Sequence, residues 1–201
     1  MLDGSAAAFK GGRDYVHGSD IATFAVGTAT ETPGLAALRR IEFHRPLVSR
    51  GVLFAEPQLA KGASAEFCAT GSFSMGDGGE LPFAIFPAPL PVLRTDLPFD
   101  EGALWPQCEV DAGAQSVRTQ QIHTLTFEEH LTSMMKLLCR TVAPTFGKWW
   151  FVRLTRNGET PPAGTELELR VRRLTADRFV AASILAGGKP WGGIEFIGRQ
   201  E

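Results

Sequence analysis

The segment from Thr126 to Pro144 constrains the fold most, because it carries a complete set of helix signals. Thr126 and Glu129 have the spacing of a capping box, in which each side chain accepts a hydrogen bond from the other residue's backbone amide. Helical periodicity follows in FEEHLTSMMKLLCRTV, and Pro144 stops the helix because proline cannot continue one. The sequence therefore predicts one long amphipathic helix in the second half of the chain.

The periodicity divides this helix into an apolar side and a polar side. The apolar side is predicted to hold Phe127, His130, Leu131, Met134, Met135 and Leu138. The polar side is predicted to hold Glu129, Thr132, Ser133, Lys136 and Arg140.

Four strand-like segments follow the helix. They are KWWFVRLTR, TELELRVRRL, RFVAASILAGG and KPWGGIEFIGR. Turn signals separate them at residues 157–158, 176–177 and 187–188, and the last two fit tight hairpins. We interpret the four segments as an antiparallel meander with one packed and one exposed face.

The first half of the chain is punctuated by glycine and proline, which favours strands and loops. Alternation predicts one strand over residues 13–26, or two strands broken at Gly18, and further strands at 40–56 with a bend at Pro46. Additional strands are expected at the positions flanking a GDGGE turn, residues 65–73 and 81–86. Residues 32–41 have a proline just inside a possible start and are read as a short helix.

Residues 87–113 form a proline-rich segment that also holds several acidic residues. We interpret it as a long ordered loop or an excursion across the surface, because its leucines, Phe99 and Trp105 argue for order. Loops of this length in compact domains are usually functional or disordered.

Composition narrows the class of protein. The 201 residues are 44% hydrophobic and 21% charged with a formal net charge of -2, which is ordinary for a globular protein. No basic run appears, so we expect no nucleic-acid partner.

No apolar run is long enough to cross a membrane and the N-terminus does not resemble a signal peptide, so we expect a cytoplasmic protein with no membrane contact. The three cysteines lack CxxC spacing, which predicts neither a zinc site nor a disulfide framework.

A helix followed by an antiparallel meander resembles the hot-dog fold, and the resemblance is best over residues 121–199. There, GTELELRVRRL and RFVAASILAGGKPWGGIEF are similar to the closing strands of the beta-hydroxyacyl-thioester dehydratases and acyl-thioesterases. IEFHRPLVSRG is faintly similar to a His-Arg-x-Pro segment of the small dehydratases. The Gly-His-Phe-Pro segment of those enzymes is absent, and QIHTLTFEEH occupies its place; the Asn-Gly-His segment of one thioesterase branch is missing too.

The resemblance implies an α+β fold in which an antiparallel sheet wraps around one long central helix. We expect a single domain over residues 1–201, with the proline-rich excursion at about 87–113. Small hot-dog proteins usually pair, so a homodimer is expected, and exposed sheet edges give a physical motive for pairing.

The function that this resemblance implies is dehydration or isomerisation of a 3-hydroxyacyl group carried by acyl-carrier protein or coenzyme A, with no cofactor and no metal. Hydrolysis of the same thioester is the nearest alternative. A second alternative function is that of a subunit that binds an acyl or polyketide chain without catalysis. A lipocalin-like closed barrel is an alternative fold, and the helix placed before the strands counts against it.

The candidate catalytic residues lie near the start of the predicted helix. His130 falls on the apolar side, where the positive end of the helix dipole keeps an imidazole neutral and able to act as a base. His123 occupies the position of the dehydratases' catalytic histidine. Glu128 is the candidate partner, since Glu129 is expected to serve in the capping box, and the free amides of the helix would polarise the thioester carbonyl. The plainer alternatives are a half-buried helix histidine at 130 and a solvent-exposed loop histidine at 123.

Candidate binding residues complete the prediction. The acyl chain would be lined by apolar side chains of the helix and of the following strand, namely Phe127, Leu131, Met134, Trp149 and Trp150. Arg45 and Arg50 are candidate contacts for the phosphate of a carrier.

Two other histidines receive structural interpretations. His17 would share a strand face with Tyr15, while Asp20 would lie on the opposite face; a polar edge strand is favoured over a catalytic cluster. His44 precedes Pro46 and is expected to mark a strand edge or bend.

A cysteine nucleophile is not expected, because Cys139 lies near the end of the helix where the dipole raises a thiol pKa.

Overall fold

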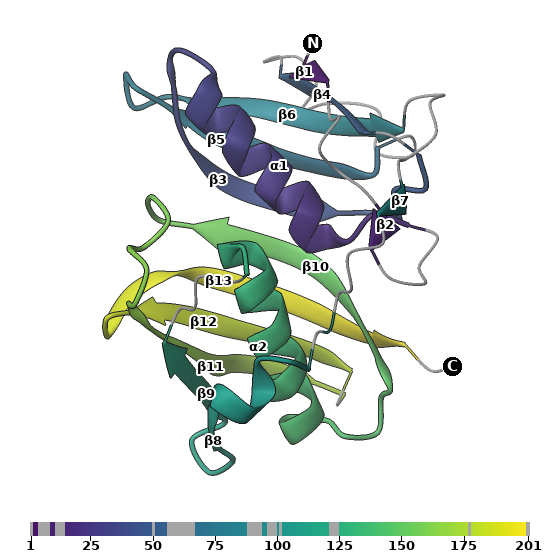
Figure 1. The fold of residues 1–201 in the computed structure, drawn as a ribbon, viewed down its shortest axis with the longest axis vertical. Helices are drawn as coiled ribbons and strands as arrows, with labels where there is room; N and C mark the ends of the chain where they lie inside the picture. The colour runs from purple at the N-terminus through teal and green to yellow at the C-terminus, as the bar shows by residue number, and fades with distance from the viewer. Residues whose placement is uncertain are drawn as a thin grey trace. The chain divides into compact units, whose positions relative to one another are not determined.

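The computed structural model describes residues 2–3, 9–10, 15–49, 51–55, 67–87, 94–95, 100, 102–120, 125–176 and 178–199. Internal contacts divide the chain into two compact units, Met1–Phe99 and Asp100–Glu201. Each unit has one long α-helix and an antiparallel sheet (Figure 1). Whether the two units act as the single domain expected over residues 1–201 stays a prediction.

The first unit combines the helix α1 (Gly18–Glu31) with strands in the order β1-β4-β6-β5-β3. These strands span Leu2–Asp3 (β1), Leu35–Phe43 (β3), Gly51–Ala55 (β4), Ala69–Met75 (β5) and Glu80–Pro87 (β6). The helix packs along β3. Two further short strands, β2 (Phe9–Lys10) and β7 (Arg94–Thr95), pair in parallel.

The helix α1 occupies a segment for which alternation predicted strands, so that prediction was wrong. Its buried residues include Ile21, Ala22, Ala25 and Ala29, which recur at helical spacing and fall on one side. Packing of that side against β3 outweighs the β-branched residues of the segment, because most helix stability in proteins comes from tertiary packing.

The short helix expected over residues 32–41 is also wrong, since this segment enters β3. Gly34 has φ +88°, a left-handed conformation that turns the chain between α1 and the strand. β3 then gains a ladder of hydrogen bonds with β5, which a lone short helix could not match. The strands expected around the GDGGE turn are confirmed as β5 and β6, joined through Gly78 at φ +87°.

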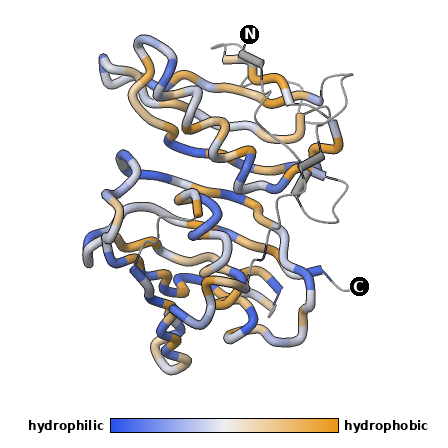
Figure 2. The backbone as a smooth tube through the Cα atoms, viewed as in Figure 1, coloured by the Kyte–Doolittle hydropathy of each residue, from blue (hydrophilic) through white to orange (hydrophobic). Residues whose placement is uncertain are grey.

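The second unit combines α2 (Phe127–Val142) with strands in the order β10-β13-β12-β11-β9-β8. These strands span Glu109–Asp111 (β8), Ser116–Gln120 (β9), Lys148–Arg156 (β10), Glu166–Thr175 (β11), Phe179–Ala186 (β12) and Lys189–Arg199 (β13). The helix lies across one face of this sheet and contacts β9, β10, β11 and β13 (Figure 1). Hydrophilic and hydrophobic segments both occur along these strands, as expected for a sheet covered on one face (Figure 2).

The four strand segments after α2 are confirmed, but their order corrects the expected meander. β11, β12 and β13 follow one another as hairpins, whereas β10 pairs with β13 and not with β11. The other edge of β11 is taken by β9. The connection 157–165, with its consecutive prolines and Gly164 at φ +82°, is therefore a crossing and not a tight turn. The turn at Gly187 and Gly188 is a tight hairpin, because both residues have positive φ.

The capping box of α2 is confirmed. Thr126 Oγ1 accepts from the Glu129 amide at 3.2 Å, and Glu129 Oε2 accepts from the Thr126 amide at 2.8 Å. The predicted apolar side is buried. The predicted polar side is not uniformly exposed, since Glu129, Thr132 and Ser133 are buried as well. One cause is the segment before β8, whose Trp105 Nε1 donates to the Ser133 carbonyl at 3.2 Å.

The described part of the proline-rich segment contains real structure. Trp105–Gln107 form a 3-10 helix, β8 follows it, and Leu104 is buried. No helix within the described ranges is long and apolar enough to cross a membrane.

Candidate functional site

A buried ion pair lies at the start of α2. Arg156 Nη1 donates to Glu128 Oε1 at 3.2 Å, and the two side chains are 2% and 4% exposed. Glu128 belongs to the first turn of α2, and Arg156 is the last residue of β10. Burying two charges costs several kcal/mol per ion, and their mutual attraction often does no more than offset that cost. A buried pair in this position is therefore a candidate functional site.

Other groups fix the guanidinium of Arg156 on several sides. Its Nη2 donates to Thr160 Oγ1 at 2.8 Å, and its Cζ lies 5.0 Å from the centre of the Trp191 ring. Phe127 contacts that ring edge-on at 4.8 Å, and Trp191 Nε1 donates to the Glu159 carbonyl at 2.8 Å. Arg156 Nε is buried and has no hydrogen-bond partner among the residues that the structure describes. The cluster thus offers one fixed N–H donor beside a carboxylate and two aromatic rings.

A β-bulge in β10 explains why Arg156 points toward α2. The register between β10 and β13 shifts between Phe151 and Arg153. Strict alternation would place Arg156 on the same face as Trp150, whereas the extra residue reverses the alternation beyond it. Burial lowers the pKa of Arg156, and the Glu128 carboxylate opposes this by favouring the cation.

His130 is fully buried on α2, and burial lowers its pKa to about 4. Burial, and not the helix dipole, is the cause of this shift, and it favours the neutral imidazole. Residues two positions apart in an α-helix are rotated by about 200° relative to each other, so the side chains of His130 and Glu128 leave the helix on different sides.

The predicted acyl-lining residues divide into two groups. Phe127, Leu131 and Met134 are buried along α2, beginning at the ion pair. Trp149 and Trp150 lie at the opposite end of β10 from Arg156, about 20 Å away along the strand. Trp149 Nε1 donates to the Phe146 carbonyl at 3.2 Å, and Trp150 lies under the guanidinium of Arg199 at 4.1 Å.

The remaining predicted residues lie elsewhere or outside the described residues. His123 and Arg50 are outside them. Arg45 is exposed in the first unit, next to His44, whose Nε2 lies 2.8 Å from Thr70 Oγ1. His44 directly follows β3, as expected for a strand end.

The prediction that His17 lies on a strand was wrong, because His17 is the buried N-cap residue of α1. Its ring stacks on Tyr15 at 6.0 Å. No capping signal marks this helix start in the sequence, because histidine is not one of the usual N-cap residues. His17 accordingly makes no side-chain capping hydrogen bond.

The cysteines match the expectation of unreactive thiols. Burial raises the pKa of Cys108 to about 11 and raises those of Cys68 and Cys139 as well. No group of three or more metal-binding side chains occurs in the described part of the chain.

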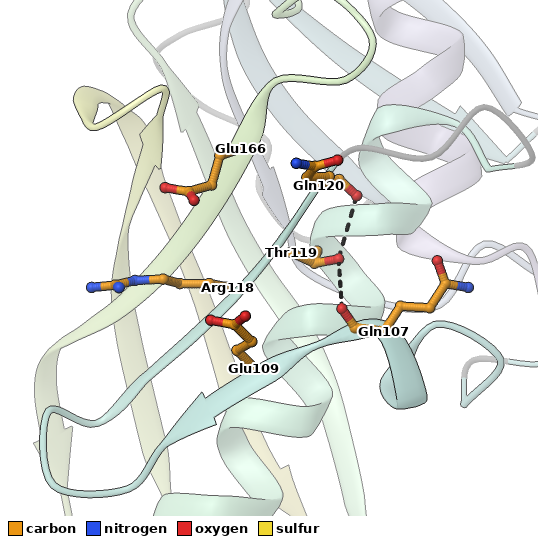
Figure 3. A pocket seen from close by; sticks show the side chains of 6 residues that line it. All are labelled: Gln107, Glu109, Arg118, Thr119, Gln120 and Glu166. Carbon is orange, nitrogen blue, oxygen red and sulfur yellow. Dashed lines mark hydrogen bonds between the residues drawn. The ribbon is translucent and has the colours of Figure 1, made fainter.

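A separate polar pocket of about 370 Å³ lies at the β8–β9 edge of the second unit (Figure 3). Its lining residues are Gln107, Glu109, Arg118, Thr119, Gln120 and Glu166. Thr119 Oγ1 donates to the carbonyls of Gln107 and Gln120 at 3.1 and 3.3 Å, so its hydroxyl is used internally. The pocket-lining Arg118 pairs with the buried Glu168 but is itself 46% exposed, whereas both members of the Glu128–Arg156 pair are buried.

Arg156, Thr160 and Trp191 were missed in the sequence. A signal for Arg156 exists in KWWFVRLTR, where an arginine follows an apolar run, but the bulge that turns it inward has no local signature. Trp191 stands in the KPWGG segment, whose Gly192 lies so close to the Thr155 carbonyl that a Cβ would be 2.1 Å from its oxygen.

Comparison with solved structures identifies the fold. A tesB protein from Mycobacterium avium subs paratuberculosis matches with a TM-score of 0.53 and 11% identity, over 96% of this chain and 91% of that one. A structure described as GphF Dehydratase 1 matches with a TM-score of 0.50 and 9% identity, over 98% of this chain and 89% of that one. No protein-family model matches the chain, and no curated protein matches it.

The chain has the hot-dog fold. This confirms the fold class and the resemblance drawn from the sequence. The correction concerns the number of helices, because α1 adds to the first unit a second long helix that the sequence did not reveal.

Proposed function

We propose that the protein processes acyl thioesters, and that its reaction is dehydration of a 3-hydroxyacyl group carried by coenzyme A or an acyl-carrier protein. The observation that carries the proposal is the buried Glu128–Arg156 pair at the start of the central helix. A structure with the same fold bears the name of a dehydratase, which adds support at the level of the fold.

Arg156 and Glu128 have distinct roles in this proposal. Negative charge builds on the thioester oxygen when a proton leaves carbon 2, and fixed N–H donors stabilise that charge. Arg156 Nε–H is such a donor, buried and unused by the described residues. The α2 amides contribute less than the sequence implied, because the capping box already uses the Glu129 amide. The Glu128 carboxylate stabilises the imidazolium that forms when a histidine acts as base.

The proposed elimination returns the enzyme to its starting state. A histidine takes the proton from carbon 2, the bond between carbon 3 and the hydroxyl oxygen breaks, and the double bond forms between the two carbons. The histidine then gives its proton to the departing hydroxyl, which leaves as water. The acyl chain lies along Phe127, Leu131 and Met134, the apolar residues that begin at the ion pair.

His123 is the proposed base and His130 the alternative. A base works best when its pKa is near the working pH, and a pKa of about 4 makes His130 a weak one. The side of α2 on which His130 lies also separates it from Glu128. A pH profile of kcat/KM distinguishes the two. Catalysis by His130 persists down to about pH 4, whereas a histidine of ordinary pKa loses activity below about pH 6.5.

The test uses purified protein with 3-hydroxyacyl and saturated acyl thioesters of coenzyme A and of an acyl-carrier protein. Product mass and free thiol are followed together. Loss of water without thiol release supports the proposal. Thiol release instead assigns a hydrolase, and tight binding without either product assigns a non-catalytic binder.

Two matched variants connect the reaction to the site. Glu128→Gln keeps a hydrogen-bond acceptor for Arg156 but removes the charge, and we expect kcat/KM to fall about 100-fold or more. Glu168→Gln is the control, because Glu168 is also a buried glutamate paired with arginines, Arg118 and Arg170, at the other side of the sheet. Equal effects of the two variants would refute the assignment of Glu128.

A further inference from the structure

The face of the second unit's sheet that turns away from α2 carries an ordered set of arginines and aromatic rings. Residues directly opposite on paired strands share a face. Thr175, Phe179, Ile197 and Trp150 form one row across β11, β12, β13 and β10. Phe196 and Phe151, stacked at 5.1 Å, belong to the alternate row and to the other face.

Arginines lie over two aromatic rings of this row. The Arg199 guanidinium lies 4.1 Å from the centre of the Trp150 ring, and that of Arg173 lies 5.8 Å from the Phe179 ring. Arg172 is exposed beside them. We name this surface the arginine–aromatic patch, consisting of Trp150, Arg172, Arg173, Phe179, Ile197 and Arg199.

The charge of the patch is strongly unbalanced. In the neighbouring row, Glu195 pairs with both Arg153 and Arg172, each at 3.3 Å. Arg173 and Arg199 have no carboxylate partner among the described residues; Arg173 Nε donates only to the Thr175 hydroxyl at 3.1 Å. Among the described residues, Arg173 and Arg199 are thus exposed cations without a carboxylate partner, in a chain whose formal net charge is -2. A local positive field on an acidic protein attracts a negatively charged partner.

The form of the patch favours a protein partner. Stacked guanidinium groups keep their N–H edges free for carboxylates and lose little freedom on binding, because stacking has already oriented them. Half-buried aromatic and aliphatic side chains between charged ones are the composition of a protein interface. The pocket at the β8–β9 edge involves none of these residues. Nucleic-acid bases would need exposed ring faces, and here guanidinium groups cover the rings of Trp150 and Phe179.

We infer that the arginine–aromatic patch is the docking surface for an acidic protein that delivers the acyl thioester. The identity of the cargo rests on the proposed function, whereas the docking itself rests on the charge and form of the patch. The patch lies at the end of β10 that is remote from Arg156, so the carrier's body and the reacting group occupy separate places. Docking and chemistry can therefore be impaired independently.

The experiment titrates the full chain with an acyl-carrier protein of net negative charge by calorimetry, at low and at high salt. The double variant Arg173→Glu/Arg199→Glu is expected to weaken binding about tenfold or more, because each change reverses a cation that has no carboxylate partner among the described residues. Arg173→Gln/Arg199→Gln gives a milder loss and guards against misfolding. Lys189→Glu is the control, since Lys189 is an exposed cation at the opposite end of β13, about 30 Å from Arg199.

Turnover of a short pantetheine thioester, which brings no carrier protein, is measured on the same variants. Weaker carrier binding with unchanged turnover of the short thioester supports the docking surface. Unchanged carrier binding in both double variants, absence of any carrier binding, or preferential binding of a single-stranded oligonucleotide would each overturn it. Absence of turnover with every thioester refutes the proposed function instead, while the binding titration still decides the role of the patch.

Discussion

Removing one partner of the Glu128–Arg156 pair is expected to destabilise the protein more than removing both. The paired atoms are 3.2 Å apart, which at an effective dielectric constant of about 20 corresponds to an attraction of about 5 kcal/mol. Both side chains are at most 4% exposed, so water cannot replace a lost partner. Glu128→Leu or Arg156→Met alone should therefore cost about 3–5 kcal/mol of unfolding free energy. The double variant leaves no buried charge and should cost about 2 kcal/mol or less.

Urea unfolding followed by tryptophan fluorescence measures these free energies. All four tryptophans lie in the second unit, so the signal reports the part of the chain that holds the pair. Arg172→Met is the control, because Arg172 is 58% exposed and its pair with Glu195 should be worth less than about 1 kcal/mol. Single variants that each lose less than about 1 kcal/mol, or a double variant that loses the sum of both, would refute a buried and coupled pair.

Three further measurements test other parts of the structure. Thr126→Ala should lower stability by about 1 kcal/mol in urea unfolding, because it removes the cap of α2; an unchanged midpoint would contradict that role. Gly27→Ala should stabilise by about 0.5–1 kcal/mol, since no atom lies within 4 Å of the added Cβ in α1, whereas Gly192→Ala should destabilise because its Cβ would meet a backbone oxygen at 2.1 Å; thermal melts of both variants would show opposite shifts. His130 has its pKa lowered to about 4, so the unfolded chain binds more protons below about pH 6.5 and stability falls by about 3 kcal/mol as the pH drops from 6.5 to 4. His130→Gln should flatten urea midpoints over that range, and an equally steep profile would assign the effect to other groups.

Local signals decided which elements the sequence revealed. Helix α2 was predictable because its capping box and its periodicity lie within the helix and the residue before it. Helix α1 was not, because its first residues offer no side-chain cap and its interior mixes glycine, threonine and valine. Its stability comes from packing along β3, a contact that no local pattern records.

The candidate site was only half predictable for a similar reason. Glu128 follows directly from the helix start, since it is the second residue after the cap. The position of the Arg156 side chain depends on the bulge after Phe151, on the pairing of β10 with β13, and on its contact with the Trp191 ring. Each of these is a relation between distant segments, so strand alternation alone assigns Arg156 to the wrong face.

The position of β13 between β10 and β12 also orders events during synthesis on the ribosome. Helix α2 and β10 emerge early, yet within the described second unit β10 has β13 as its strand partner. Until Lys189–Arg199 leave the exit tunnel, β10 and β12 lack the strand that pairs with both, and α2 lacks one of the strands that it contacts. Arg156 meets Trp191 only at that stage, so the last strand closes the sheet and completes the site in a single late step.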